Sequence, residues 1–524
     1  MSMELQKRLH TEFRRHGIGL RRESIKLVAA YVVDSGLEVE AASQQVLQEL
    51  EKKNLSTTIP TEETVEDIIA LLLEPDIEED SSVQIISAFE VPKFHYDPIR
   101  KHFWRSKSET TNLFGNAESK ISIYRDRLSI LQHRVQRNVL FNKPSLEFGA
   151  VKRDWCELTQ IQGLAGCIGE TKFILGMLSE IEDGKLFVED PSGAVPVDIS
   201  HALTTTGLFT ENCGVVAEGE LGQDGIFHVS VLGLPPLETR EAFAEVTGEE
   251  NFFGGQAVSP DEIAEIEEKM EKSAASELFV VLSDVWLDRE GTHDRLRTVL
   301  SGFNEVETVP SLFIFIGNFT SRYVGLEGGK ISELKAHFKA LGELIASFPR
   351  LMESAKFIFV PGPSDPSPSQ AFPRPPLPAC LTSSLSDSLG ESAIIATNPC
   401  RIRFFTQEIV IFREDLQQRM QRLTCLTPDT QETKSFFQHV AVTVLGQGHL
   451  CPLPITVQPV YWEFDHAMRL YSAPHVLILA DQAQSEEFHY QEANSKCFNP
   501  GSFGTDGSFA AYRPVQQVVE LSAC

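Results

Sequence analysis

The stretch VVLSDVWLD, residues 280–288, is an apolar run that gives way to one acidic residue, Asp284. A continuous apolar run of this length is typical of a strand that is buried on both faces of its sheet. Two similar runs follow, SLFIFIGNF at 311–319 and KFIFVPGPSD at 356–365, and amphipathic helical patterns separate the three. This alternation predicts a layered α/β domain over residues 276–524.

Polar residues and glycines follow each of the three predicted strands directly. Asp284 follows the first strand, Gly317 and Asn318 follow the second, and Gly362 and Asp365 follow the third. In α/β sheets, sites form where strands give way to loops at the carboxyl ends. We therefore expect these residues to lie together at one edge of the sheet.

The chain upstream divides into four further parts, so we predict a multidomain α+β protein. Residues 1–75 show helical apolar spacing and helix caps, which predict a small N-terminal helical bundle. Residues 76–149 begin with the acidic stretch DIEEDSS, a predicted linker, and continue as a long helix. Residues 150–240 contain five short strands joined by the turns EDG, DPSG and GQDG, which predict an OB-fold β-barrel. Residues 241–275 form a connector.

Two of these segments leave alternatives open. The basic and aromatic stretch RKHFWRSK at 100–107 is predicted to be an exposed loop, with a weak nuclear signal or a phosphate contact as alternatives. OB barrels bind single strands when basic grooves carry stacking aromatic residues. The predicted strands here carry Glu180, Glu182 and Asp183 and few aromatic residues. A protein-docking or structural barrel is therefore favoured over one that binds single-stranded DNA.

Composition limits the partners. The 524 residues include 46 Lys and Arg against 74 Asp and Glu, a formal net charge of −28. Such a chain repels a phosphate backbone over most of its surface, so proteins are the expected partners. The nine cysteines are scattered without a C-x-x-C pair, which argues against a disulfide framework or a structural zinc site and indicates a reducing compartment. No apolar run is long enough to span a membrane, so we expect no membrane partner.

The residues at the strand ends resemble the blocks of the calcineurin-like phosphoesterases. That family holds two metal ions, about 3.5–4 Å apart, with carboxylate, amide and histidine ligands. This chain departs from the family pattern at nearly every block. Trp286 replaces a histidine, Asn318 replaces the bridging aspartate, and Asp365 lacks its neighbouring histidine. ILAD at 478–481 lies where Gly-His-x-His is expected, and no H-x-H occurs among the 14 histidines.

These departures predict a calcineurin-like α/β sandwich that lacks its metal ligands, with no catalytic residue and no cofactor. Seven residues make up this vestigial site: Asp284, Trp286, Gly317, Asn318, Gly362, Asp365 and His449, the histidine retained in GQGHL. We expect the buried Asp284 carboxylate to accept hydrogen bonds from loop amides. An active metal-dependent phosphoesterase or nuclease with unusual ligands is the alternative.

A barrel followed by such a domain resembles the B subunits of eukaryotic replicative DNA polymerases. The resemblance rests on FVEDPSGAVPVDIS in the barrel and, in the α/β domain, on VLSDVWLD, IGNF, VPGPSDP, PRPPLP, TNPCRI, EIVIFREDL, GQGHLCPLP and CFNPGSF. Within that family the chain resembles the epsilon branch, which carries an N-terminal helical domain like the lid of AAA+ ATPases and NLFG before a long helix. The resemblance covers essentially the whole chain.

The resemblance implies a non-catalytic accessory subunit of the DNA polymerase epsilon complex, in the nucleus, that acts in chromosomal DNA replication and repair. Its main partner would be the catalytic subunit, gripped through that subunit's C-terminal zinc module. Other polymerase subunits and the replicative helicase would be further partners, and DNA would be met mainly through the holoenzyme. Phe372 and Trp462 are candidate interface anchors, although a place in the core is favoured for both.

Overall fold

The computed structural model describes residues 83–524 except 107–111, 144–154, 249, 256–259, 325–327 and 429–434, together with scattered positions of the first 82 residues. Residues 1–82 and 83–524 form two compact units. In the first unit, the described positions are helical, and Leu9 and Phe13 are buried. The predicted bundle and the acidic linker otherwise lie outside the described residues. Within the described part of the chain, no helix is both long and apolar enough to cross a membrane.

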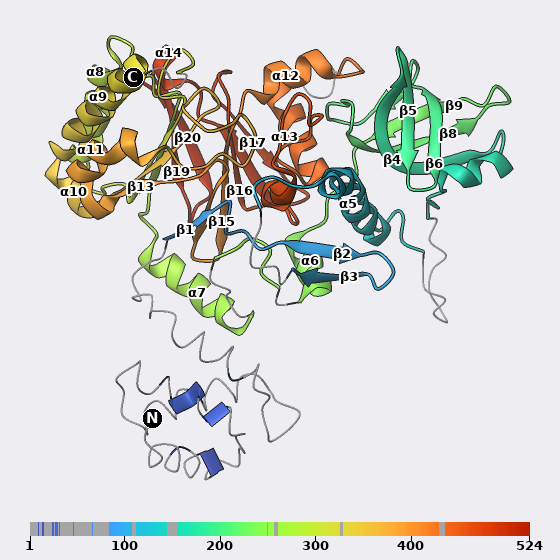
Figure 1. The fold of residues 1–524 in the computed structure, drawn as a ribbon, viewed down its shortest axis with the longest axis horizontal. Helices are drawn as coiled ribbons and strands as arrows, with labels where there is room; N and C mark the ends of the chain where they lie inside the picture. The colour runs from blue at the N-terminus through green and yellow to red at the C-terminus, as the bar shows by residue number, and fades with distance from the viewer. Residues whose placement is uncertain are drawn as a thin grey trace. The chain divides into compact units, whose positions relative to one another are not determined.

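The α/β domain contains two six-stranded sheets that pack face to face (Figure 1). The first has the order β13-β12-β11-β10-β19-β20, and its core strands β10 to β13 are parallel. Its strands are β10 (Phe279–Ser283), β11 (Leu312–Ile316), β12 (Lys356–Val360), β13 (Ala393–Ile395), β19 (Ser508–Arg513) and β20 (Val518–Ala523). The three apolar runs at 280–288, 311–319 and 356–365 therefore supply adjacent parallel strands, as predicted.

The second sheet has the order β1-β14-β15-β16-β18-β17. Its strands are β1 (Val83–Ser87), β14 (Cys400–Phe404), β15 (Gln407–Arg413), β16 (Val476–Ala480), β17 (Glu486–Tyr490) and β18 (Ser495–Asn499). The edge strand β1 comes from far upstream and pairs antiparallel with β14, so the segment directly after the acidic stretch is part of this sheet. The sequence pattern did not predict that strand.

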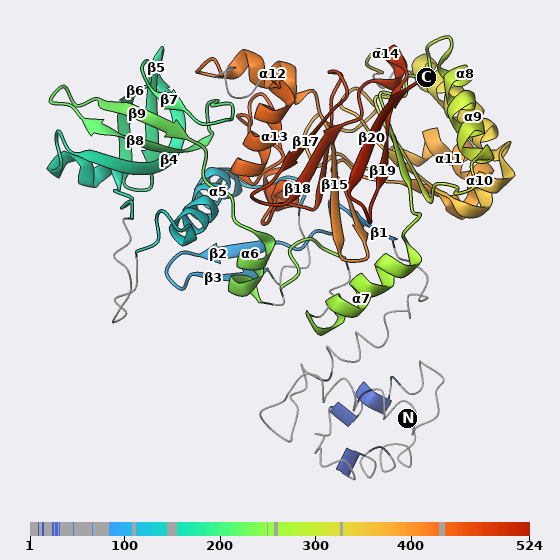
Figure 2. The same cartoon turned by 180° about the vertical axis from the view of Figure 1, so that it is seen from behind.

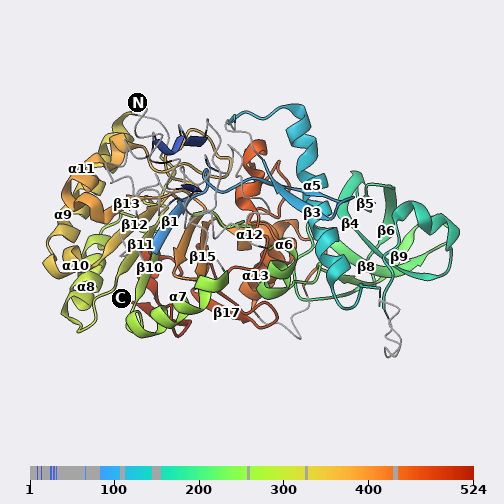
Figure 3. The ribbon, with the colours of Figure 1, turned by 90° about the horizontal axis from the view of Figure 1, so that it is seen from below.

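Alternation along the strands builds four layers, which Figure 3 shows from below. In β11, Phe313 and Phe315 face outward against helices, whereas Ile314 and Ile316 face the second sheet. The outer helices on this side are α8 (Thr292–Glu305), α9 (Gly328–Ala346), α10 (Pro349–Ser354) and α11 (Ala379–Leu389). The outer face of the second sheet packs on α12 (Leu416–Leu423) and α13 (Phe436–Gln447). Each sheet thus buries both faces, which explains its continuous apolar runs.

The predicted barrel is present, with six strands that close through pairing of β6 with both β5 and β9. Its strands are β4 (Thr171–Glu182), β5 (Lys185–Asp190), β6 (Gly193–Asp198), β7 (Leu203–Thr204), β8 (Gly214–Leu221) and β9 (Phe227–Gly233). The hairpin turns fall at the predicted EDG, DPSG and GQDG stretches. Closure leaves the interior to apolar side chains, among them Ile174, Val188 and Phe227.

The stretch at 100–107, which we expected to be a loop, contains a strand. β2 (Phe94–Asp97) and β3 (His102–Arg105) pair as an antiparallel hairpin. Phe103 is buried in an aromatic cluster, while Trp104 next to it is about half exposed. Burial of alternate side chains thus overrides the basic character of the stretch.

The long helix α5 (Ala117–Arg137) lies between barrel and sandwich, as Figure 2 shows. On one side, its Leu128 packs with Leu175 of the barrel. On the other side, Arg127 donates to Asp465, with 2.6 Å between Nη2 and Oδ1, and both side chains are buried. The same Asp465 carboxylate accepts from Arg469, with 3.0 Å between Oδ2 and Nη2. A buried ion cluster therefore joins this helix to the sandwich.

The barrel also contacts the sandwich directly through α13. Gln447 makes a reciprocal pair with the Gly214 backbone: its Oε1 accepts from Gly214 N at 2.7 Å, and its Nε2 donates to Gly214 O at 2.8 Å. One turn earlier, the Thr443 hydroxyl accepts from Leu208 N at 2.8 Å. Barrel and sandwich are therefore joined by buried polar contacts that require one relative placement.

Replacing Gln447 with alanine should loosen this junction. The change leaves the buried N–H of Gly214 without a side-chain partner and its C=O with only the weak thiol donor of Cys213, at a cost of about 1–3 kcal/mol for a fully unsatisfied group. We expect a lower melting temperature and faster hydrogen exchange in peptides that cover residues 205–216, measured by mass spectrometry. Gln438→Ala, in the same helix but partly exposed, is the matched control. Unchanged exchange at 205–216 would show that the barrel does not depend on this pair.

Candidate functional site

Five strands of the two sheets end at one edge of the sandwich. β10, β11 and β12 run parallel and end before Asp284, Gly317 and Pro361, and β15 and β16 run parallel in the second sheet. Hydrogen bonds connect the loops that follow these strands. The structure thus brings together Asp284, Gly317, Asn318, Gly362 and Asp365, the predicted strand-end residues.

A buried arginine, Arg413 at the end of β15, occupies the centre of this edge. Its Nη2 lies 2.7 Å from Oδ1 of Asp284, and neither side chain is exposed to solvent. Its Nε donates to Gly317 O at 3.0 Å, and its Nη1 donates to Oδ1 of Asp415 at 2.7 Å. Burial by itself lowers the pKa of Arg413, but Asp284 and Asp415 outweigh burial and hold that pKa above its ordinary value.

Asp284 also accepts from the loop after β11. Asn318 N lies 3.2 Å from Asp284 Oδ1, and Asn318 Nδ2 lies 3.5 Å from the same oxygen. The expected loop-amide hydrogen bond is therefore confirmed. The guanidinium was not expected, and it is the main partner because it brings a full positive charge.

Backbone amides hold the second carboxylate, Asp365. Its Oδ1 accepts from Phe319 N at 2.8 Å, and its Oδ2 accepts from Gly362 N at 2.7 Å. Burial raises the pKa of Asp365 to about 6, so the group is ionised at neutral pH. A side chain at Gly317 would place its Cβ 1.9 Å from Oδ2 of Asp365, so the close approach of these loops requires glycine there.

Trp286 fills space beside the site. Its backbone N donates to Asp284 O at 2.8 Å, and its ring lies under the guanidinium of Arg289, 4.9 Å from the ring centroid. A Cβ at Gly504 would lie 2.6 Å from the indole, so chain and ring are in close contact. An indole has one N–H donor and no metal-ligating lone pair. Trp286 is therefore a packing residue here.

Asp481 follows β16, at the same edge of the sandwich. Its carboxylate accepts from Gln417 N at 2.9 Å and from Ala483 N at 3.1 Å. Burial raises its pKa. Gln417 belongs to the first turn of α12, where backbone N–H groups favour a negative charge. Asp481 thus serves as an anchor for that helix.

His449 lies outside this cluster, and its assignment to the site is corrected accordingly. It follows α13, accepts from Cys451 N at its Nδ1 (3.0 Å), and places its Nε2 3.2 Å from Oδ1 of Asp465. These partners belong to the ion cluster under α5. Burial, together with the nearby positive charge of Arg127, lowers the pKa of His449 to about 4. Its position in the sequence motif did not reveal this, because the end of α13 sets where the ring points.

The arrangement offers little to a metal ion. Within the described part of the chain, no group of three or more His, Cys, Asp or Glu side chains is placed to hold one. The carboxylates of Asp284, Asp365 and Asp481 already accept from a guanidinium or from backbone amides, although Oδ2 of Asp284 is buried without a hydrogen-bond partner. Sequence reasoning missed Arg413, although the FRED stretch after a buried strand placed a charge at this edge. Ion pairs and hydrogen bonds from the chain itself thus involve each of the three carboxylates.

The candidate anchors differ in burial. Phe372 is 1% exposed and packs in the core beside Phe412. Trp462 is partly buried under the ammonium of Lys120, 5.5 Å from the ring centroid. The favoured placement in the core therefore holds for Phe372.

Two family models match the chain. The model for the B subunit of DNA polymerases alpha and epsilon matches residues 279–489, and the model for the OB-fold domain of proteins like DNA polymerase epsilon subunit 2 matches residues 117–236. The B subunit of DNA polymerase epsilon from Arabidopsis thaliana is 40% identical, over 99% of this chain and 98% of its own length. The DNA polymerase epsilon subunit 2 of Homo sapiens is 35% identical over the same shares.

Replacing Arg413 with methionine should make the domain easier to unfold. The substitution leaves Asp284 as an uncompensated buried charge, which costs about 3–5 kcal/mol. We expect urea unfolding to show this loss, and the double variant Asp284→Asn, Arg413→Met to regain part of it. Arg513→Met, which breaks an exposed pair with Glu520, should cost about 1 kcal/mol or less. A double variant no more stable than Arg413→Met would contradict the pairing argument.

The lowered pKa of His449 gives a pH dependence with a definite sign. Between pH 6.5 and about 4 the unfolded chain binds a proton that the native ring resists, so stability falls as pH falls. Between pH 7.5 and 5.5, the wild type should lose about 1 kcal/mol more than His449→Asn, whose amide oxygen can still accept from Cys451. Urea unfolding at both pH values measures the difference. Equal losses in the two proteins would show that His449 is not held neutral.

Proposed function

Because the chain belongs to the DNA polymerase epsilon subunit 2 family, the non-catalytic accessory subunits of a replicative DNA polymerase, we propose that it acts as a rigid mount for the catalytic subunit. The barrel and sandwich together would grip the C-terminal zinc module of that subunit. The metal would then belong to the partner. The observation that carries the proposal is the buried Asp284–Arg413 pair, because an internal cation already compensates the carboxylate that follows the first strand.

Rigidity supports this role. The sandwich, α5 and the barrel are joined by the Gln447–Gly214 pair and by the buried Arg127–Asp465 pair. When a partner binds to both domains, this chain then loses little conformational freedom. The main entropic cost of binding is the ordering of the partner itself. Interfaces between permanent subunits often bury more than about 2,000 Å². A preassembled pair of domains offers a surface of that order.

The surface charge of the barrel favours a protein partner over single-stranded DNA. Between residues 155 and 236 the chain has twelve aspartates and glutamates, two lysines and no arginine. Among the described barrel residues, the large exposed apolar side chains are Ile168, Ile181 and Leu203, and none is aromatic. Binding of single strands needs a basic groove and stacking aromatics, and the barrel supplies neither. A basic protein surface complements it.

The N-terminal domain and the cellular role belong to the same proposal. The N-terminal domain, residues 1–75, would be an AAA+ lid-like helical domain that docks on other components such as the replicative helicase. The protein would work in the nucleus, in chromosomal replication and repair, and would meet DNA mainly through the holoenzyme. The family membership supports these statements.

Co-purification tests the proposal. The full chain, mixed with the C-terminal region of a polymerase epsilon catalytic subunit, should co-elute on gel filtration, and removal of zinc from the partner should abolish the complex. The melting temperature of the chain alone should not change with chelator, since the proposed zinc site is in the partner. A chelator-resistant complex would contradict the zinc module as the contact, and failure to co-elute would contradict the mount.

The same preparation separates the two alternatives. With Mn²⁺ or Zn²⁺ added, the chain should not hydrolyse a generic phosphodiester; turnover that Asp284→Ala abolishes would favour an active hydrolase. The chain should also bind single-stranded DNA weakly at physiological salt, whereas tight, salt-sensitive binding would favour a DNA-binding barrel.

A further inference from the structure

A cavity of about 370 Å³ opens at the edge of the second sheet opposite to the vestigial site. It is bounded by the turn between β14 and β15, by α6 (Arg240–Thr247) and by the loop that precedes β16. Glu408, near the start of β15, faces it, whereas Arg413 at the end of the same strand belongs to the vestigial site. Five residues of extended strand span about 17 Å, so the two places are separate.

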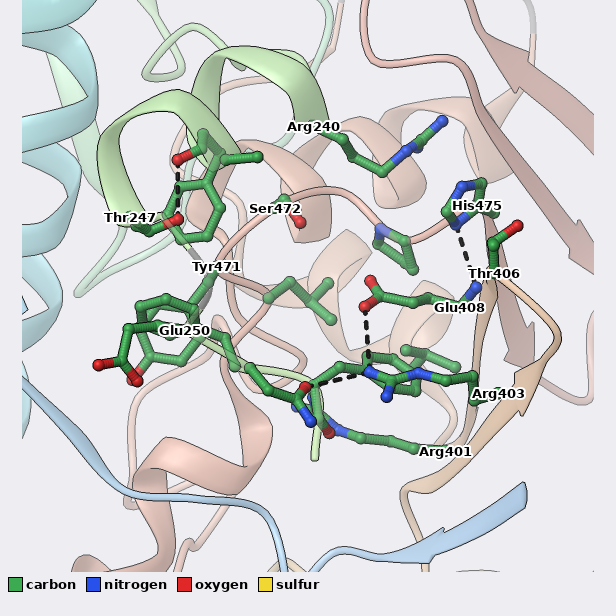
Figure 4. Close-up of a pocket in the computed structure, with 18 of the residues that line it drawn as sticks. Arg240, Thr247, Glu250, Arg401, Arg403, Thr406, Glu408, Tyr471, Ser472 and His475 are labelled. Atoms are coloured by element: carbon green, nitrogen blue, oxygen red, sulfur yellow. Dashed lines mark hydrogen bonds and ion pairs between the residues drawn. The ribbon is translucent and has the colours of Figure 1, made fainter. Parts of the chain in front are cut away.

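Arginines gather around this cavity, as Figure 4 shows. Arg403 stands directly opposite Glu408 in the β14–β15 register, with 3.7 Å between Nη2 and Oε1. Arg401 lies two residues before Arg403 on the same face of β14, and Arg240 of α6 lies at the margin of the cavity, on the side of His475. Among the described residues that line the cavity, the acidic ones are Glu408 and Glu250, and Glu250 is exposed at the rim.

Carbonyl groups orient two of these arginines without neutralising them. Arg401 is buried and donates to the carbonyls of Ala467 and Arg469, at 3.0 and 2.8 Å. Arg240 donates to the carbonyls of Ala473 and Ala493, at 3.2 and 3.1 Å. A carbonyl dipole satisfies an N–H group but carries no net charge. A fourth lining arginine, Arg469, is already paired with Asp465. The cavity is therefore a cationic place in a chain of net charge −28.

The rest of the lining is largely aromatic. Phe243, Phe252, Phe253, Phe405 and Tyr471 contribute to it. The guanidinium groups of Arg401 and Arg403 lie over the ring of Phe253, at 5.2 and 5.4 Å from its centroid. Such a stack holds the guanidinium planes in place and leaves an apolar floor beside fixed positive charge. The cavity therefore suits a ligand with an apolar body and a nearby anion.

We propose that this cavity is a docking site for an acidic peptide segment of a partner protein. An apolar or aromatic side chain of the segment enters the cavity, and a neighbouring carboxylate meets Arg403 and Arg240. Charge complementarity selects the occupant, because the rest of the acidic surface repels such a segment and leaves this place as its favourable contact. Arg240, Arg401 and Arg403 exceed the two lining glutamates, Glu408 and Glu250, by one positive charge. One carboxylate matches that excess, whereas a phosphate would bring two negative charges next to Glu408. The site is independent of the proposed grip on the catalytic subunit.

A fluorescence polarisation experiment on the full chain tests the proposal. The probe is a fluorescein-labelled twelve-residue peptide of Asp, Glu, Phe and Leu; matched peptides replace Phe and Leu with Ser, or Asp and Glu with Lys. We expect the first peptide to bind with an affinity that falls as the salt concentration rises. Both matched peptides should bind at least tenfold more weakly. ATP and an oligo-dT strand should not displace the probe.

Variants place the binding at the cavity. Arg240→Gln with Arg403→Gln should weaken the peptide at least tenfold, and Arg100→Gln, an exposed arginine on another element, should not change it. Ala244→Trp, at an exposed position of α6 that lines the cavity, should block binding even if the arginine variant folds poorly. No binding, equal binding of the lysine peptide, displacement by ATP or oligo-dT, or wild-type affinity in Ala244→Trp would each overturn the proposal.

Discussion

The electrostatic balance at the carboxyl edge of the sandwich depends on one buried ion pair, Asp284 with Arg413. The sheets deliver the carboxylates of Asp284, Asp365 and Asp481 to a place with little access to water, where isolated charges are costly. In a two-metal hydrolase, the metal cations compensate the buried carboxylates, and they exchange with solvent. Here the guanidinium of Arg413, which is part of the chain, compensates them together with backbone amides. The chain itself therefore supplies the counter-charge of Asp284.

The same pair also fixes the two sheets to each other. Asp284 follows a strand of the first sheet and Arg413 ends a strand of the second, and Arg413 donates to Gly317 O of the first sheet as well. The two halves of the sandwich are thereby joined by directional bonds as well as by apolar packing. The Gln447–Gly214 pair extends that fixed geometry to the barrel. A protein whose work is to hold a partner at one position gains from this stiffness, whereas an enzyme with exchanging metal ligands would need looser loops.

Local sequence pattern predicts the parts of this structure that depend on near neighbours. Continuous apolar runs indicated the parallel strands, and turn residues indicated the barrel hairpins. The features that the sequence pattern did not predict depend on residues that are far apart in the chain. Arg413 reads as a surface charge until Asp284, 129 residues away, is known to face it. The short strand β1 pairs with β14 across more than 300 residues. His449 stays in a recognisable motif, yet Asp465 and Arg127 decide its surroundings. Long-range charge compensation carries no local period, so no window of sequence reveals it.

Charged side chains are compensated differently at the two ends of the second sheet. This difference decides which end can still bind a charged ligand. At the carboxyl end, Arg413 meets two carboxylates, so its charge is neutralised inside the fold. At the amino end, Arg401 and Arg240 donate to carbonyls, which orient a guanidinium without a counter-charge, and Glu408 compensates only part of the positive charge there. Aromatic rings beside them keep water from screening that field fully. Within the described residues, this acidic chain thus retains a fixed cationic cavity, and the carboxylate of the proposed partner would compensate its remaining positive charge.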